Sequence, residues 1–253
     1  MIRQIRTELL KLRTIRLPLG LLAAAAGLTA LFTTLGAANA GGAGHMAPPP
    51  LYAAAGVSSL LGRSSLAMLL AAVFGITVSS GEFRHSTATA TYLATPNRAR
   101  VLMAKATVAA AVGLLFGVVG AALTTGITLA FVAAKGYSLT VSGITIARFA
   151  AGAIVGSGLL AAVGVGLGSL IRSQLAAIVT VFLWATLVEQ LIGGLFDWIQ
   201  PYLPFTTAGT MAGAVLGGDT SALPFAAAAA LVAGVAVVVS GVAARTTVQA
   251  DIS

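Results

Sequence analysis

The sequence predicts an all-α integral membrane protein with six transmembrane helices, an N-terminal amphipathic interfacial helix, and a cytoplasmic helix between helices 2 and 3. Two observations support this prediction. Of the 253 residues, 58% are hydrophobic and 8% are charged, and a soluble protein with this balance would lack the polar side chains to cover its surface. The apolar residues also form six continuous runs, close to the roughly 20 residues that a membrane-crossing helix needs. Continuous runs argue against a β-barrel, whose short strands alternate apolar and polar positions.

Residues 1–16 are expected to form the interfacial helix. Ile2, Ile5, Leu9 and Leu12 recur at steps of three and four residues, so they share one face of a helix. Basic side chains surround that face, which is typical of a helix that lies in the membrane interface and contacts anionic headgroups. The alternative is that this basic segment serves only as a topology signal.

The six spans are expected to form one transmembrane domain, residues 1–253. They cover residues 17–38, 65–80, 106–133, 148–170, 174–195 and 222–243. The third run is longer than a span requires, so it tilts or continues beyond the membrane. Glycines four residues apart recur in these runs, for example Gly164 and Gly168, and such pairs let helices approach closely.

The distribution of lysine and arginine predicts the orientation. If the N-terminus is cytoplasmic, all of the 14 basic residues except Arg63, Lys135 and Arg148 fall in cytoplasmic segments. This asymmetry predicts that both termini are cytoplasmic. It also accounts for the formal net charge of +8 without a nucleic-acid partner, because the chain has no basic–aromatic interleaving and no zinc or helix-turn-helix spacing.

The outer loop, residues 196–221, has two parts. Its first half holds aromatic residues suited to the membrane interface and the helix-breaking residues Pro201 and Pro204. The apolar stretch 206–216 that follows is too short to cross the membrane. Two alternatives remain open for it: a short outer or re-entrant helix, or a disordered tail behind an aromatic belt.

Residues 81–105 form a polar, basic island between two apolar runs. The island has an acidic residue at its start, a Thr/Ala-rich body of helical length, a stop at Pro96 and a basic exit. These features predict a small cytoplasmic helix that is held against a partner protein.

Ionisable residues inside membrane spans are candidates for function. Glu189, toward the outer end of the fifth span, is the best of them, and three roles remain open: it pairs with Arg63 or Arg148, it gates the outer mouth, or it faces water at the interface. His45 and His85 are isolated and the chain has no cysteine, so neither a metal site nor a disulfide is expected. No catalytic motif is present, and we do not expect an enzyme.

The chain resembles the membrane subunit of a bacterial ABC-2 type transporter, in the form without a fused ATPase domain. The segment Glu8–Thr14 is similar to the family's amphipathic entry helix, and the segment from Gly81 to Lys105 resembles the family's element after span two. The six-span layout, with a proline-containing outer stretch, also agrees. The resemblance covers essentially the whole chain. It implies a plasma-membrane exporter in which this chain and a second copy, or a homologous permease, dock two cytoplasmic ATPases.

The resemblance also implies roles for particular residues. The island would be the coupling helix that contacts the ATPase, with Glu82, Phe83, Arg84, Tyr92, Leu93, Arg98 and Arg100 at the contact. Ordinary positive-inside charge is the alternative for the arginines. Phe74, Phe182, Trp184 and Glu189 would line the transport pathway, and the alternative for the aromatic residues is contact with lipid or core packing. The chain has no phosphate-binding loop, so the partner ATPase would bind ATP and Mg²⁺, and no cofactor is expected here.

The expected substrate is hydrophobic or amphipathic: a drug, a lipid or a peptide. An interior with few fixed charges suits such molecules better than ions or sugars. The alternative function is an autonomous secondary transporter or a channel, and a weaker one is a membrane-anchoring subunit. An ion-coupled carrier usually has several buried charges, whereas this chain offers Glu189 and, at the inner end of span two, Glu82.

Overall fold

A computed structural model of the chain describes residues 17–42, 48–84, 98–214 and 222–249. These ranges contain helices and no strand, and six of the helical segments are long and apolar enough to cross a membrane. The all-α, six-helix prediction is confirmed at this level. The expected interfacial helix, 1–16, and most of the expected coupling helix lie outside the described residues.

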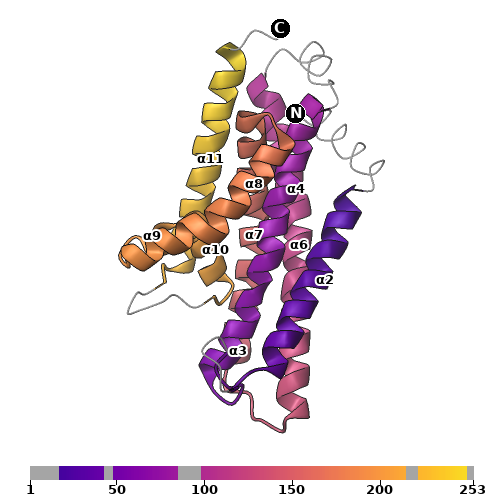
Figure 1. Ribbon diagram of the computed structural model, residues 1–253, viewed down its shortest axis with the longest axis vertical. Helices are drawn as coiled ribbons and strands as arrows, with labels where there is room; N and C mark the ends of the chain where they lie inside the picture. Colours follow the sequence, from indigo (N-terminus) through magenta and orange to yellow (C-terminus); the bar gives the residue numbers. More distant parts are fainter. Residues whose placement is uncertain (1–16, 43–47, 85–97, 215–221, 250–253) are drawn as a thin grey trace.

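Figure 1 shows how the described helices are arranged. Their bounds are α2 Leu17–Ala38, α3 Ala54–Leu61, α4 Ser65–Arg84, α6 Arg98–Ala134, α7 Gly143–Ile171, α8 Gln174–Leu183, α9 Glu189–Leu195, α10 Pro204–Met211 and α11 Phe225–Gln249. A 3₁₀ turn, Gly62–Ser64, joins α3 to α4, and a π-helical turn, Trp184–Val188, joins α8 to α9. A second 3₁₀ turn, Gln200–Tyr202, precedes α10.

Three crossings begin before their apolar runs, and the fourth crossing does so at Gly143 instead of Arg148. The second extends over Ala54–Gly81, because the backbone continues through the polar sequence Gly62–Ser64 as a 3₁₀ turn. The third helix, α6, begins at Arg98 instead of Ala106, so the basic exit of the polar island is helical. At the other end of the second crossing, α4 continues past Ser80 to Arg84, so helical backbone enters the island from both sides.

The central helix of the bundle is α7. It packs against α4, α6, α10 and α11. In the most apolar stretch of each crossing, 67% of the residues of the α3–α4 segment and 61% of those of α7 are buried. The share is 17% in Gln174–Leu195 and 17% in α11. The fifth and sixth crossings are therefore peripheral, and in Figure 1 the α8–α9 segment runs obliquely over the bundle while α11 lies along its side.

Glycines bring the backbones of α4 and α7 into direct contact. A methyl group on Gly75 would collide with the carbonyl oxygen of Ala161, and one on Gly164 would collide with the carbonyl oxygen of Ala72. The two helices thus contact each other reciprocally at these glycines, as small-residue interfaces in membranes do.

Two cations stabilise the C-terminal end of α2. Arg63 Nη1 donates to the carbonyl oxygen of Phe32 at 2.9 Å, and its guanidinium lies on Gly36. Lys135 Nζ donates to the carbonyl oxygen of Ala37 at 3.5 Å. Positive charge is favourable at a helix C-terminus, where carbonyl groups lack intrahelical partners. These contacts link α2 to the second and third crossings.

The topology leads to a direct prediction. In Figure 1 the α4 end, the α6 start and the α11 end lie at one pole of the bundle, and the α2 end, α3 and the α6–α7 connection lie at the other. A reporter that is active only in the cytoplasm should therefore work when fused at Asn97 or Ser253 and fail at Gly42 or Asp219. Reporter activity at Gly42 would contradict the six-crossing topology.

Candidate functional site

A cavity of about 390 Å³ lies between the fifth crossing, α4, α7 and α10. This volume is within the roughly 300–1,000 Å³ typical of small-molecule sites. The residues that line it are Ser65, Leu66, Met68, Leu69, Leu160, Ala185, Thr186, Gln190, Gln200, Phe205, Thr206, Gly209, Thr210 and Ala214. None of these side chains is charged, so the cavity is a neutral site inside a membrane-crossing bundle.

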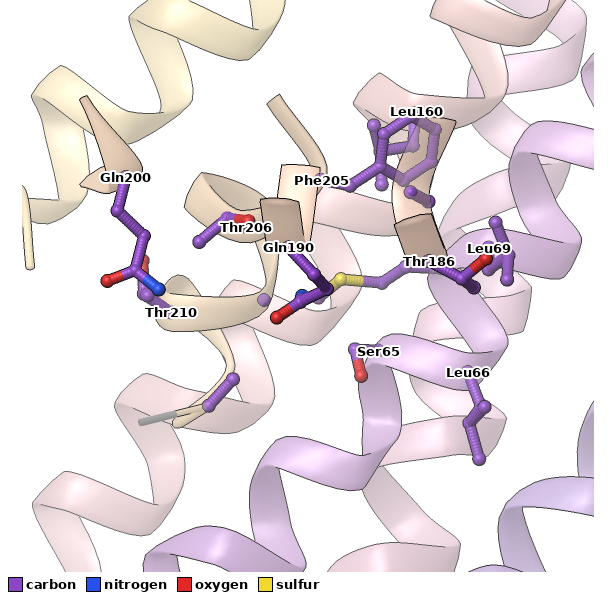
Figure 2. A pocket seen from close by; sticks show the side chains of 14 residues that line it. Ser65, Leu66, Leu69, Leu160, Thr186, Gln190, Gln200, Phe205, Thr206 and Thr210 are labelled. Carbon is purple, nitrogen blue, oxygen red and sulfur yellow. The ribbon is translucent and has the colours of Figure 1, made fainter. Parts of the chain in front are cut away.

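One side of this cavity is mainly polar and the other is mixed. Figure 2 shows Gln200, Thr206 and Thr210 on the first side, and Leu66 and Leu69 on the second, where Ser65 and Thr186 lie beside the leucines. The polar end is built mainly from α10 and the segments around it, and the mixed end mainly from α4 and α7. A ligand that matches both ends is amphipathic.

The wall formed by α10 is held in place by Glu189. Pro204 is the first residue of α10 and has no N–H, so Phe205 and Thr206 carry the first free amides of the helix. Glu189 Oε1 accepts the Phe205 amide at 3.0 Å, and Oε2 accepts the Thr206 amide at 2.7 Å and the Thr206 hydroxyl at 2.8 Å. The carboxylate thus caps α10 from a separate crossing, as anions at helix N-termini do.

A fourth donor reaches Glu189 because of the π-helical turn. Within this turn the Glu189 amide donates to the carbonyl oxygen of Trp184, five residues earlier, which is the bonding pattern of a π-helix. The two side chains then lie together, and Trp184 Nε1 donates to Glu189 Oε1 at 3.0 Å. Each carboxylate oxygen therefore accepts two hydrogen bonds, and Glu189 is only 1% exposed.

The other end of α10 packs closely on α7. A methyl group on Gly152 would collide with the carbonyl oxygen of Met211, so only glycine allows this approach. Gly213 has φ +97° and lies against the ring of Phe149, a backbone conformation that favours glycine after a helix end. Near the start of the short helix, Thr207 Oγ1 donates to the carbonyl oxygen of Pro201, in the preceding 3₁₀ turn, at 2.7 Å. The helix is therefore fixed at both ends.

The apolar stretch after the outer prolines thus contains a helix, α10, from Pro204 to Met211. In Figure 1 it lies beside the bundle, well above the pole that carries α3. Thr207 and Ala208 are fully buried. Both features agree with the re-entrant alternative for this segment.

The four residues suggested for a transport pathway lie in different environments. Phe74 is 1% exposed and stacks on Phe116, with ring centroids 5.8 Å apart, in the core. Phe182 and Trp184 are about two-fifths exposed on the fifth crossing. None of the four lines the cavity. Trp184 donates to Glu189, and Glu189 accepts from the first amides of α10, which forms one wall of the cavity.

The partners of Glu189 bear on two of its three suggested roles. The carboxylate bonds Trp184, Phe205 and Thr206, and among the described residues no salt bridge to Arg63 or Arg148 is found. It does not face water, because it is buried. The third suggestion, that Glu189 gates the outer mouth, stays a prediction.

The residues suggested for coupling lie at the ends of α4 and α6 or outside the described residues. Tyr92 and Leu93 lie outside the described residues. Glu82, Phe83 and Arg84 belong to the last turn of α4, and Arg98 to the first turn of α6, where the structure describes the backbone but not these side chains. Arg100 is exposed on α6.

The cavity residues were not identified from the sequence. Ser65, Thr186 and Thr210 look like the many other small polar residues of the spans, and Gln200 lies in the outer loop. The adjacent pair Glu189–Gln190 was the one available signal in the fifth crossing, since two long polar side chains there are unusual.

The described residues contain no group of three or more His, Cys, Asp or Glu side chains that could hold a metal ion. No protein-family model matches this chain, and no curated protein matches it at a significant level.

Proposed function

We propose that this chain is the permease subunit of an ABC-2 type transporter that exports a hydrophobic or amphipathic substrate across the bacterial plasma membrane. A separate ATPase subunit would bind Mg²⁺ and ATP and supply the energy. The observation that carries the proposal is the support of the polar island, 81–105, by two helices that extend beyond their apolar runs, α4 to Arg84 and α6 from Arg98. Such an arrangement suits a segment that transmits force from a partner.

The packing agrees with a transport cycle. The island connects α4 and α6, and both helices pack on α7. One wall of the cavity comes from α4, and another from α10, which also packs on α7. A displacement of the island would reach the cavity through α4 directly. The chain would act with a second copy or a homologous permease.

The buried carboxylate weighs against an autonomous ion-coupled carrier. Glu189 is the one acidic residue of the sequence within the six crossings. Its two oxygens already accept four hydrogen bonds from the protein. A coupling ion or proton would have to displace these structural bonds, so this site does not suit the exchange of ions.

The proposal is tested by copurification. The wild-type chain, extracted in detergent, is expected to capture the ATPase encoded by the adjacent reading frame. Tyr92→Ala combined with Leu93→Ala should weaken that complex by roughly 2 kcal/mol or more, because truncating two buried interface side chains costs a few kcal/mol. ATP hydrolysis should then no longer depend on substrate.

Thr87→Ala combined with Thr89→Ala serves as the matched control, since it alters the same segment without removing large side chains. It should retain the ATPase. If the wild-type chain captures no ATPase, the proposal is wrong, and if the Tyr92/Leu93 variant binds at wild-type strength, the segment is not the docking element.

A further inference from the structure

The cavity offers hydrogen bonds without charge. Its polar side chains are hydroxyls and primary amides: Ser65, Thr186, Gln190, Gln200, Thr206 and Thr210. The hydroxyls of Thr186, Thr206 and Thr210 donate to the Phe182 carbonyl, to Glu189 and to the Thr207 carbonyl, so toward a ligand they act as acceptors, while a primary amide both donates and accepts. A ligand group that both donates and accepts, such as a hydroxyl or an amide, matches this lining.

The neighbouring carboxylate does not alter this neutral character by binding a cation. Both oxygens of Glu189 have two donors each, which fills the roughly four lone-pair sites of a carboxylate. No basic side chain lines the cavity to balance an anionic ligand. Burying an unpaired charge is far more costly than burying a hydrogen-bonded neutral group.

The cavity is open on the side of the fifth crossing. Thr186 and Gln190 line it and are exposed. The nearby Leu183, Leu187 and Leu191 are each at least half exposed. In a protein of this composition such leucines contact acyl chains, so the opening leads into the hydrocarbon region of the membrane.

We propose that this cavity binds an amphipathic lipid with an uncharged, hydroxyl- or amide-bearing head, and that its acyl chain leaves between α4 and the fifth crossing. The head contacts the polar end near α10, and the first part of the chain contacts Leu66, Leu69 and Leu160. The inference rests on the proposed function, since it names the substrate class of that transporter. It narrows the class from amphipathic molecules in general to those with neutral heads.

The test uses the full chain, purified in a zwitterionic detergent, and counts bound lipids by native mass spectrometry. Two probes share an oleoyl chain and a glycerol: 1-monooleoylglycerol, which is uncharged, and 1-oleoyl-lysophosphatidic acid, which is anionic. We expect one saturable monooleoylglycerol per chain and at least tenfold weaker binding of the anionic lipid. Free glycerol should not displace the neutral lipid.

Two variants assign the binding to the cavity. Thr210→Val removes a hydroxyl from the polar end, and Ala185→Leu fills the cavity without removing a polar group; each should weaken monooleoylglycerol binding at least fivefold. Thr107→Val is the matched control, because the hydroxyls of Thr107 and Thr210 each donate to a carbonyl of their own helix, and Thr107 is exposed and away from the cavity. If Thr210→Val fails to fold, the binding of monooleoylglycerol by Ala185→Leu still tests whether the lipid occupies the cavity.

Equal binding of the two lipids, or binding that neither variant weakens, would overturn the inference. Displacement by free glycerol would overturn it in favour of a soluble ligand. The measurement needs no ATPase, so its failure is distinct from that of the proposed function. A chain that binds monooleoylglycerol in this way but captures no ATPase keeps the cavity assignment and loses the permease assignment.

Discussion

Glu189→Ala should produce the largest loss of stability of any single substitution at the cavity. It leaves four donors without their acceptor: the indole of Trp184, the amides of Phe205 and Thr206, and the hydroxyl of Thr206. Each buried donor left unpaired costs about 1–3 kcal/mol. Even with partial relaxation of α10, we expect the free energy of unfolding to fall by more than about 3 kcal/mol.

Two comparisons make this result specific. Glu189→Gln keeps one acceptor oxygen but directs an NH₂ group at two donors, so its effect should be intermediate. Asp197→Ala makes the same chemical change as Glu189→Ala at an exposed position and should leave stability almost unchanged. Denaturation of the purified protein, followed by circular dichroism, ranks the three variants. Equal stability of Glu189→Ala and Asp197→Ala would show that the carboxylate does not hold α10.

A local readout is also available. The chain has two tryptophans, so a Trp198→Phe background leaves the fluorescence of Trp184 alone. Loss of the Glu189 acceptor should shift the Trp184 emission, because its N–H then finds a different partner. The same variant should bind monooleoylglycerol more weakly, since the polar wall of the cavity is no longer positioned.

Gly164→Ala should be the most damaging change in the core of the bundle. Its methyl group would collide with the carbonyl oxygen of Ala72, and backbone cannot rotate away as a flexible side chain can. Overpacking of this kind typically costs about 1–3 kcal/mol. Gly75→Ala meets Ala161 from the opposite side of the same crossing, so the two effects should not simply add.

The control for this prediction is Gly126→Ala. Gly126 lies in the interior of α6, and a methyl group there would meet no heavy atom within 4 Å. Alanine is favoured over glycine in a helix by up to about 1 kcal/mol, so this variant should be as stable as the wild-type protein or slightly more so. Thermal midpoints of the purified variants measure the difference. Similar midpoints for Gly164→Ala and Gly126→Ala would rule out the tight α4–α7 contact.

The apolar helices were predictable because side-chain hydrophobicity alone decides which segments suit a membrane. The bounds of α2 and of the fifth crossing coincide with their apolar runs. The second crossing does not, since its continuation through Gly62–Ser64 depends on a tertiary contact. Arg63 interrupts the hydropathy pattern, yet its Nη1 donates to a carbonyl of α2, and no local pattern records that contact.

The site was predictable only in part. Glu189 stands out in the sequence because a carboxylate in an apolar span is rare. Its partners do not stand out, because Phe205 and Thr206 act through their backbone amides, which every residue except proline carries. The cavity is less visible still, since Ser65 and Thr210 come from distant parts of the chain and neither is unusual in its own segment. Their meeting depends on the packing of α10 on α7.

The π-helical turn between α8 and α9 changes which residues of the fifth crossing lie on the same side of the helix. In a regular α-helix each residue advances about 100° around the axis, and the wider π turn absorbs one surplus residue. The residues after Val188 therefore lie about 100° behind the positions around the axis that a regular α-helix would give them. If Trp184–Val188 were instead a regular α-helical turn with the same residues, Glu189 would lie about 100° further around the axis, away from α10, with the crossing still long and apolar. Deleting Thr186 should therefore remove the π turn and leave Glu189 on the side that faces α10, whereas the same deletion in a regular helix would rotate every later residue.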